Sequence, residues 1–124
     1  MSATGARAGT RNLVVQQAAS FVLQLTVKTG DPATPVDLTG ASAKMEVRSD
    51  TAIGVVLELS TTNGRITIDG PNGVLTLRIA AADTAALSLV DFPARYDLLL
   101  TYADTTVDRI LEGLVRLNPA VTEP

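Results

Sequence analysis

Three acidic residues in the C-terminal third are the first candidates for chemistry, because two carboxyl groups can cleave a glycosidic bond as acid and base or nucleophile. They are Asp97, Asp108 and Glu112. Only 3% of the residues are aromatic and none is Trp, so few side chains could stack against a sugar ring. We therefore interpret the three acids as solvated or ion-paired charges on strands.

Three other aspartates lie in segments rich in Gly and Pro, where their oxygens could bind calcium. They are Asp31, Asp37 and Asp69, and their spacing is not that of an EF-hand loop. Aspartate also stabilises turns, because its side chain accepts hydrogen bonds from nearby backbone N–H groups. We interpret all three as turn residues and predict neither a tightly bound metal nor a cofactor.

Histidine and cysteine are both absent from the sequence. This excludes a Ser-His-Asp triad, a cysteine nucleophile, a zinc site of ordinary ligands and a disulfide framework. The 10 Lys and Arg are scattered among 13 Asp and Glu, which gives a net charge of −3 and no basic stripe for phosphate contacts. We expect a protein that is no enzyme and binds no nucleic acid.

The chain of 124 residues has the size of one domain. Its apolar stretches are strand-sized and fall short of the roughly 20 residues that cross a bilayer, so no membrane partner is expected. Residues 1–11 lack the apolar centre of a secretory signal and are predicted to form a flexible arm. We predict a soluble β domain over residues 12–117 and an extended tail over residues 118–124, which is bracketed by prolines.

The acids near the C-terminus would be positioned by two long strands within residues 94–117, joined by a turn at residues 103–106. Side chains alternate between the faces of a strand with period two. One face of the first strand carries Tyr96, Leu98, Leu100 and Tyr102, and one face of the second carries Leu111, Gly113, Val115 and Leu117. We interpret these faces, including both tyrosines, as core.

The opposite face of this hairpin carries apolar residues beside charges. Leu99, Ile110 and Leu114 are expected there, next to Arg116. Contiguous exposed apolar area beside charges favours a protein interface. The alternative is that these strands lie in mid-sandwich or beneath residues 80–89. Arg7 and Arg11 of the predicted arm are candidates for contacts with a neighbouring subunit.

The rest of the chain shows the same alternation in short segments, with Gly, Pro, Asn and Asp between them. Strands are predicted within residues 12–17, 20–28, 41–49, 55–59, 65–69 and 74–79, and residues 29–40 are predicted to be a loop. Residues 80–89 break the alternation and predict a short helix capped by Asp83. The pattern predicts an all-β, immunoglobulin-like antiparallel sandwich of seven or eight strands with one helical turn.

Several motifs in their order carry a resemblance to a known family. They are Val36-Asp37-Leu38-Thr39-Gly40, AKMEVR at 43–48, LELST at 57–61, NGRI at 63–66, LTL at 75–77, ADTAAL at 82–87, YDL at 96–98 and RILEG at 109–113. Together they resemble small immunoglobulin-like virion proteins of tailed bacteriophages and prophages. The chain is more distantly similar to the amino-terminal domain of siphophage baseplate upper proteins, which attach receptor-binding parts to the tail. Leu114 with Arg116 departs from the small polar residues expected on an exposed strand face.

This resemblance implies a structural protein of the virion, assembled in the cytoplasm of the host bacterium. The expected role is an adaptor or accessory subunit at the tail tip, baseplate or fibre junction, which forms a homo-oligomer in the particle and has other virion structural proteins as partners. The resemblance brings no catalytic residues. Two alternatives remain: a decoration protein on the capsid, and a carbohydrate-binding β-sandwich.

Overall fold

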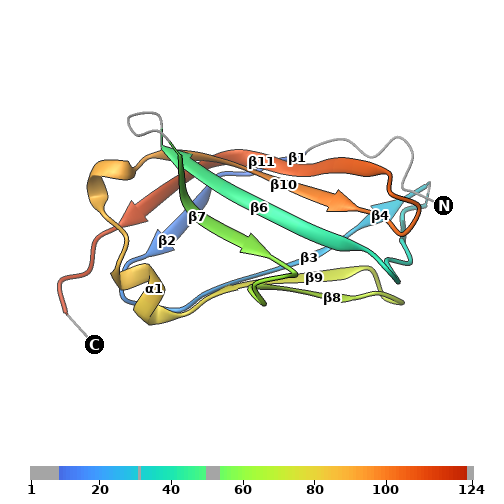
Figure 1. Ribbon diagram of the computed structural model, residues 1–124, viewed down its shortest axis with the longest axis horizontal. Helices are drawn as coiled ribbons and strands as arrows, with labels where there is room; N and C mark the ends of the chain where they lie inside the picture. Colours follow the sequence, from blue (N-terminus) through green and yellow to red (C-terminus); the bar gives the residue numbers. More distant parts are fainter. Residues whose placement is uncertain (1–8, 31, 50–53, 123–124) are drawn as a thin grey trace.

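The computed structural model describes residues 9–30, 32–49 and 54–122. Their larger sheet has the strand order β1-β11-β10-β6-β7, and β2 also pairs with β11 (Figure 1). Within it, β1 and β2 run parallel to β11, and the other pairs are antiparallel. The strands are β1 (Gly9–Thr10), β2 (Leu13–Gln16), β6 (Ser42–Ser49), β7 (Val55–Ser60), β10 (Ala94–Thr101) and β11 (Val107–Asn118).

A smaller antiparallel sheet packs against the first and has the order β3-β9-β8. Its strands are β3 (Phe21–Thr26), β8 (Ile66–Asp69) and β9 (Val74–Ile79). Two sheets with this strand order form an immunoglobulin-like sandwich, as the alternation predicted. The described residues hold eight strands of four or more residues, and the segment predicted to be a loop adds the short pair β4 (Lys28–Thr29) and β5 (Thr34–Pro35).

The core between the sheets is almost entirely aliphatic. Both tyrosines of β10 and its C-terminal extension are buried, Tyr96 at 4% and Tyr102 at 5% exposure, which confirms their predicted place in the core. Two further core residues, Val36 and Leu38, come from the predicted loop after β5. The segment is irregular in backbone but contributes apolar side chains to the same cluster.

The hairpin β10–β11 confirms the predicted pair of long strands, but it contains a bulge. Leu98 pairs with Leu111, whereas Leu99 pairs with Arg109, so Ile110 is the extra residue between two rungs. Ile110 is half-buried and packs against the core. The prediction that Ile110 lies on the outer face with Leu99 and Leu114 was wrong, because simple alternation takes no account of a bulge.

The segment after β9 forms α1 (Ala81–Ala85) and a 3-10 turn, η1 (Leu89–Asp91). Asp83 was predicted to cap the helix, but the N-cap is Ala80, and Asp83 lies in the first turn. Thr84 is fully buried and its hydroxyl donates to the carbonyls of Ala19 at 2.8 Å and Ala81 at 3.0 Å. Neither of these described helices is long and apolar enough to cross a membrane.

The N-terminal segment runs along the edge of β11 as two short strands, β1 and β2, which both pair with it in parallel. Between β1 and β2, Arg11 N–H donates to Glu112 O at 2.8 Å, and the Tyr96 hydroxyl donates to Arg11 O at 2.6 Å. Burial raises the pKa of Tyr96 to about 12. Residues 9–11 were predicted to belong to a flexible arm and instead lie along the sheet. Residues 1–8, with Arg7, lie outside the described residues.

The β10–β11 turn contains a strained residue, Thr105, with φ of 72°. A β-branched side chain is unfavourable in this left-handed region, whereas Asn tolerates it. We expect Thr105→Asn to raise the free energy of unfolding by about 1 kcal/mol, measured by urea titration. Thr106→Asn, one residue further along the same turn, is the control, and an equal gain in both variants would contradict the explanation by strain.

Candidate protein interface

The outer face of the larger sheet is organised into three rungs of cross-strand neighbours, which we call the charged face. The first and third rungs are basic with one leucine each, and the middle rung is acidic. The rungs are Leu114–Arg95–Arg48, then Glu112–Asp97–Glu46–Glu58, then Arg109–Leu99–Lys44. Its strands are among the best-paired elements of the sandwich, so the side chains project from a rigid support.

Four carboxylates in one rung would repel one another, since like charges on directly opposed residues destabilise a sheet. Cations of the neighbouring rungs offset this repulsion. Arg109 Nε lies 3.4 Å from Asp97 Oδ2, and Arg109 Nη1 lies 3.8 Å from Glu112 Oε2. Asp97 and Glu112 are therefore ion-paired strand charges, as interpreted from the sequence. The third acid, Asp108, departs from that interpretation, because it is half-buried and its Oδ2 is buried without a hydrogen-bond partner among the described residues.

The other half of the acidic rung is paired in the same way. Lys44 Nζ lies 3.4 Å from both Glu46 Oε2 and Glu58 Oε1, and Arg48 Nη2 lies 2.8 Å from Glu46 Oε1. The hydrogen bond from Arg48 lowers the pKa of Glu46, and the hydrogen bond to Glu58 raises the pKa of Lys44. Exposed pairs of this kind contribute little stability, so their main effect is to fix the pattern of charge.

Exposed apolar side chains lie within this pattern of charge. Leu99 is 36% exposed and Leu114 is 39% exposed, as predicted from strand parity. Val14 was not predicted to belong to this face; it is 48% exposed on β2 and pairs in register with Arg116. The alternation of buried Leu13 and Val15 around it was the available signal. A shallow hollow of about 720 Å³ runs past Leu99 and Leu114 to Asn12 at the sheet edge.

The predicted interface residues are thus only partly brought together. Leu99, Leu114 and Arg116 project from β10 and β11 to the outer face, while Ile110 packs against the core. Arg11 is exposed beside β11, at the edge of the hollow lined by Thr10 and Asn12. Arg7 lies outside the described residues.

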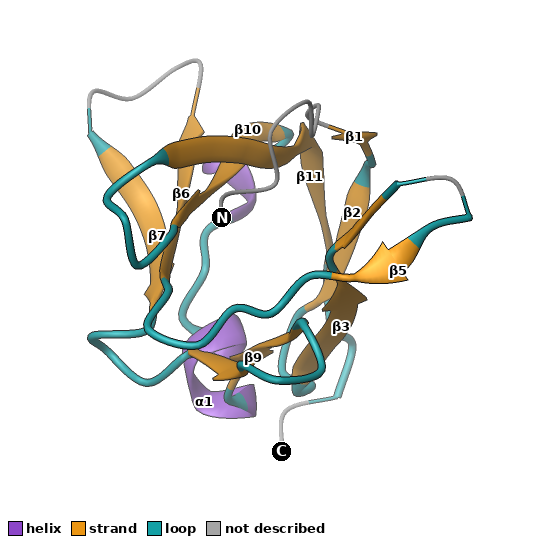
Figure 2. Ribbon diagram, turned by 90° about the vertical axis from the view of Figure 1, so that its right-hand side faces the viewer, coloured by secondary structure: helices purple, strands orange, loops and turns teal. Residues whose placement is uncertain are grey.

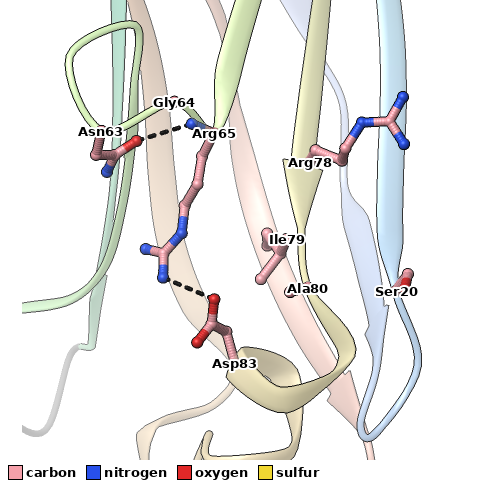
Figure 3. Close-up of a pocket in the computed structure, with 8 residues that line it drawn as sticks. All are labelled: Ser20, Asn63, Gly64, Arg65, Arg78, Ile79, Ala80 and Asp83. Atoms are coloured by element: carbon pink, nitrogen blue, oxygen red, sulfur yellow. Dashed lines mark hydrogen bonds and ion pairs between the residues drawn. The ribbon is translucent and has the colours of Figure 1, made fainter.

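A second hollow, of about 670 Å³, lies between β9 and α1 (Figure 3). Arg65 Nη2 lies 3.0 Å from Asp83 Oδ2, and Arg65 Nη1 donates to Glu58 O at 2.8 Å. The Arg78 side chain points away from this pair. Arg65 therefore ties α1 to β7, and the two arginines do not converge on a common anion site.

The loop aspartates serve turns in the described segments. Asp37 Oδ1 accepts hydrogen bonds from Thr39 N at 3.0 Å and Thr39 Oγ1 at 2.6 Å, which lower the pKa of Asp37. Asp69 Oδ2 accepts from the Asn72 amide at 2.9 Å. Asp31 lies outside the described residues. Within residues 9–30, 32–49 and 54–122, no group of three or more acidic side chains is placed to hold a metal ion.

Comparison with known proteins assigns the chain to a family. No curated protein matches the chain in sequence. Residues 7–118 match the family described as LtfC-like, β-sandwich domain. This match spans β1 to the end of β11, which includes both sheets and the charged face. The chain therefore belongs to the LtfC-like β-sandwich domain family.

Proposed function

We propose that the chain is a structural protein of a tailed-phage virion that performs no catalysis and acts by docking. Its place would be an adaptor at the tail tip, baseplate or fibre junction. The observation that carries the proposal is the pair Leu99 and Leu114, exposed on a rigid sheet among ordered charges. The order of the phage-like motifs supports the virion as the setting.

The charged face suits a specific contact with another folded subunit. Burial of Leu99, Leu114 and Val14 would supply the apolar centre of the contact. The alternating basic and acidic rungs would fix its register, because a shift by one rung places like charges against each other. Replacing ion pairs within the sheet by ion pairs to the partner subunit adds little affinity. Most of the affinity would therefore come from burial of the apolar residues.

Replacing Leu114 with Asp should therefore prevent incorporation into particles without unfolding the domain. Leu114 N–H donates to Asn12 Oδ1 at 3.1 Å through the backbone, and a new side chain leaves this bond in place. Incorporation is measured by complementing a phage from which the gene for this chain is deleted. Circular dichroism and thermal melting of the purified variant check the fold.

Val90→Asp is the matched control, since Val90 is 78% exposed in η1, outside the large sheet. It should incorporate normally. Unfolding of Leu114→Asp would assign Leu114 to a buried layer, and normal incorporation of Leu114→Asp would remove the charged face from the contact.

The virion setting itself is tested by the deletion phage. Purified wild-type particles should contain the chain by mass spectrometry, and an antibody should label the tail. The proposal would be overturned if the deletion phage formed normal, infectious particles and wild-type particles contained no copy of the chain. Label on the capsid shell would favour a decoration protein instead.

A further inference from the structure

The strand β3 forms one side of the small sheet and has only β9 as a partner among the described strands (Figure 2). Its inward residues Phe21, Leu23 and Leu25 are only half-buried. Their partners on β9 in the same rungs are at most 1% exposed. The sandwich thus leaves an apolar row partly uncovered along this edge, because no strand within the described residues pairs with the other side of β3.

The hydrogen bonds around β3 show which backbone groups point outward. Val27 N–H donates to Gly73 O, and Arg78 N–H donates to Arg65 O, both at 2.8 Å. Since the backbone groups of a strand alternate between its two edges, Phe21, Leu23 and Leu25 bond to β9. The N–H and C=O groups of Val22, Gln24 and Thr26 therefore face the open edge.

The other described sheet edges carry features that discourage strand addition. The β1–β2 edge is interrupted at Arg11, β7 has Glu58 near its middle and a register shift against β6, and β8 has four residues ending in Asp69. In contrast, β3 is a regular strand of six residues without charge or proline, and Val22 on it is 53% exposed.

We propose that β3 is a homodimerisation edge, which pairs antiparallel with β3 of a second copy about a two-fold axis at Gln24. This inference does not depend on the proposed virion role. In this register each Val22 faces Thr26 of the other copy and Gln24 faces Gln24, which allows six backbone hydrogen bonds. The two small sheets then form one continuous sheet across the dimer.

The side chains make this register self-complementary, which is what a two-fold interface requires. On the inner side Leu23 faces Leu25 of the second copy, and the two half-buried rows cover each other. On the outer side Lys28 faces Ser20 of the second copy. No like charges oppose each other at any position from Ser20 to Lys28, so a second copy fits the edge without repulsion.

Gln24→Pro tests the edge directly. Its N–H points away from β9, so proline removes an outward donor and spares the pairing within the domain. We expect wild type to sediment as a dimer in analytical ultracentrifugation and Gln24→Pro to be monomeric. Gln24→Ala retains the N–H and is the control, which should remain dimeric. A monomeric wild type, or a dimeric Gln24→Pro, would overturn the proposal.

Charge variants test the register of the dimer, and they still test the proposal if the proline variant unfolds. Gln24→Glu and Gln24→Lys each place two like charges across the axis and should weaken the dimer at least tenfold, whereas their mixture should form a heterodimer. Failure of the mixture to associate would overturn this register and the proposal with it. Leu114→Asp should dimerise like wild type, and its loss of dimer would assign the contact to the charged face.

Discussion

Replacing Gly113 with Ala is expected to release the N-terminal strand from the edge of β11. A Cβ at position 113 would collide with the backbone carbonyl oxygen of Arg11 and come within 3.1 Å of Asn12 Oδ1. Arg11 and Asn12 run alongside β11 at this point, between β1 and β2, and a backbone carbonyl cannot move aside as a flexible side chain could. Arg11 and Asn12 would have to lift away from β11.

Three hydrogen bonds depend on the position of Arg11 and Asn12: Arg11 N–H to Glu112 O, Tyr96 hydroxyl to Arg11 O, and Leu114 N–H to Asn12 Oδ1. At about 1 kcal/mol each, their loss should lower the free energy of unfolding by about 3 kcal/mol. Leu13 and Val15, now buried in the adjoining strand, would lose part of their packing as well.

Urea unfolding measures this loss, and amide hydrogen exchange shows where it occurs. Protection should fall first in β2. Gly9→Ala is the control, because a Cβ there meets Leu111 Cδ1 at 3.6 Å, an ordinary contact. If Gly113→Ala kept wild-type stability and wild-type protection, Arg11 and Asn12 would be able to accommodate a side chain at position 113, and the prediction would be wrong.

The regular part of this fold could be predicted because its strands obey strict alternation. β10 is paired on both sides and its inward residues, such as Leu98 and Leu100, are fully buried. Burial on one face of a strand leaves a period of two in the sequence. The same argument correctly placed Leu99 and Leu114 outside.

The errors have specific physical origins. The bulge at Ile110 adds one residue to one strand, and nothing in the apolar pattern marks it. Residues 9–11 have no apolar side chain and are held by backbone bonds to β11 and by the Tyr96 hydroxyl, which a hydropathy pattern cannot register. Asp83 was assigned to the cap, but a partner distant in sequence, Arg65, pairs with it.

The predicted loop before β6 is the most informative case, because it is largely a loop as its Gly and Pro residues indicated, yet two of its residues join the core. Leu38 is 1% exposed, and its backbone is held by bonds from Leu38 N–H to Gly70 O at 2.7 Å and from Ala41 N–H to Leu38 O at 2.9 Å. The segment is thus fixed at both its side chain and its backbone, as an irregular part of the sandwich.

Leu38→Ala should therefore destabilise the domain as strongly as a substitution in a central strand. Removal of a fully buried leucine side chain costs about 2–5 kcal/mol, because apolar burial is lost and the cavity closes only partly. The neighbouring turn cannot collapse easily into the space, since Gly70 already lies so close to Thr39 that an added Cβ would come within 2.9 Å of Thr39 Cα.

Urea titration at constant m-value measures the effect, and Leu38→Met is the control that nearly conserves volume and should cost less than about 1.5 kcal/mol. If Leu38→Ala cost no more than the methionine variant, the segment would be an ordinary surface loop. If Leu38→Ala instead lowered the free energy of unfolding as much as a core substitution does, residues 36–40 would be a structural element of the sandwich, held in place by the burial of Leu38.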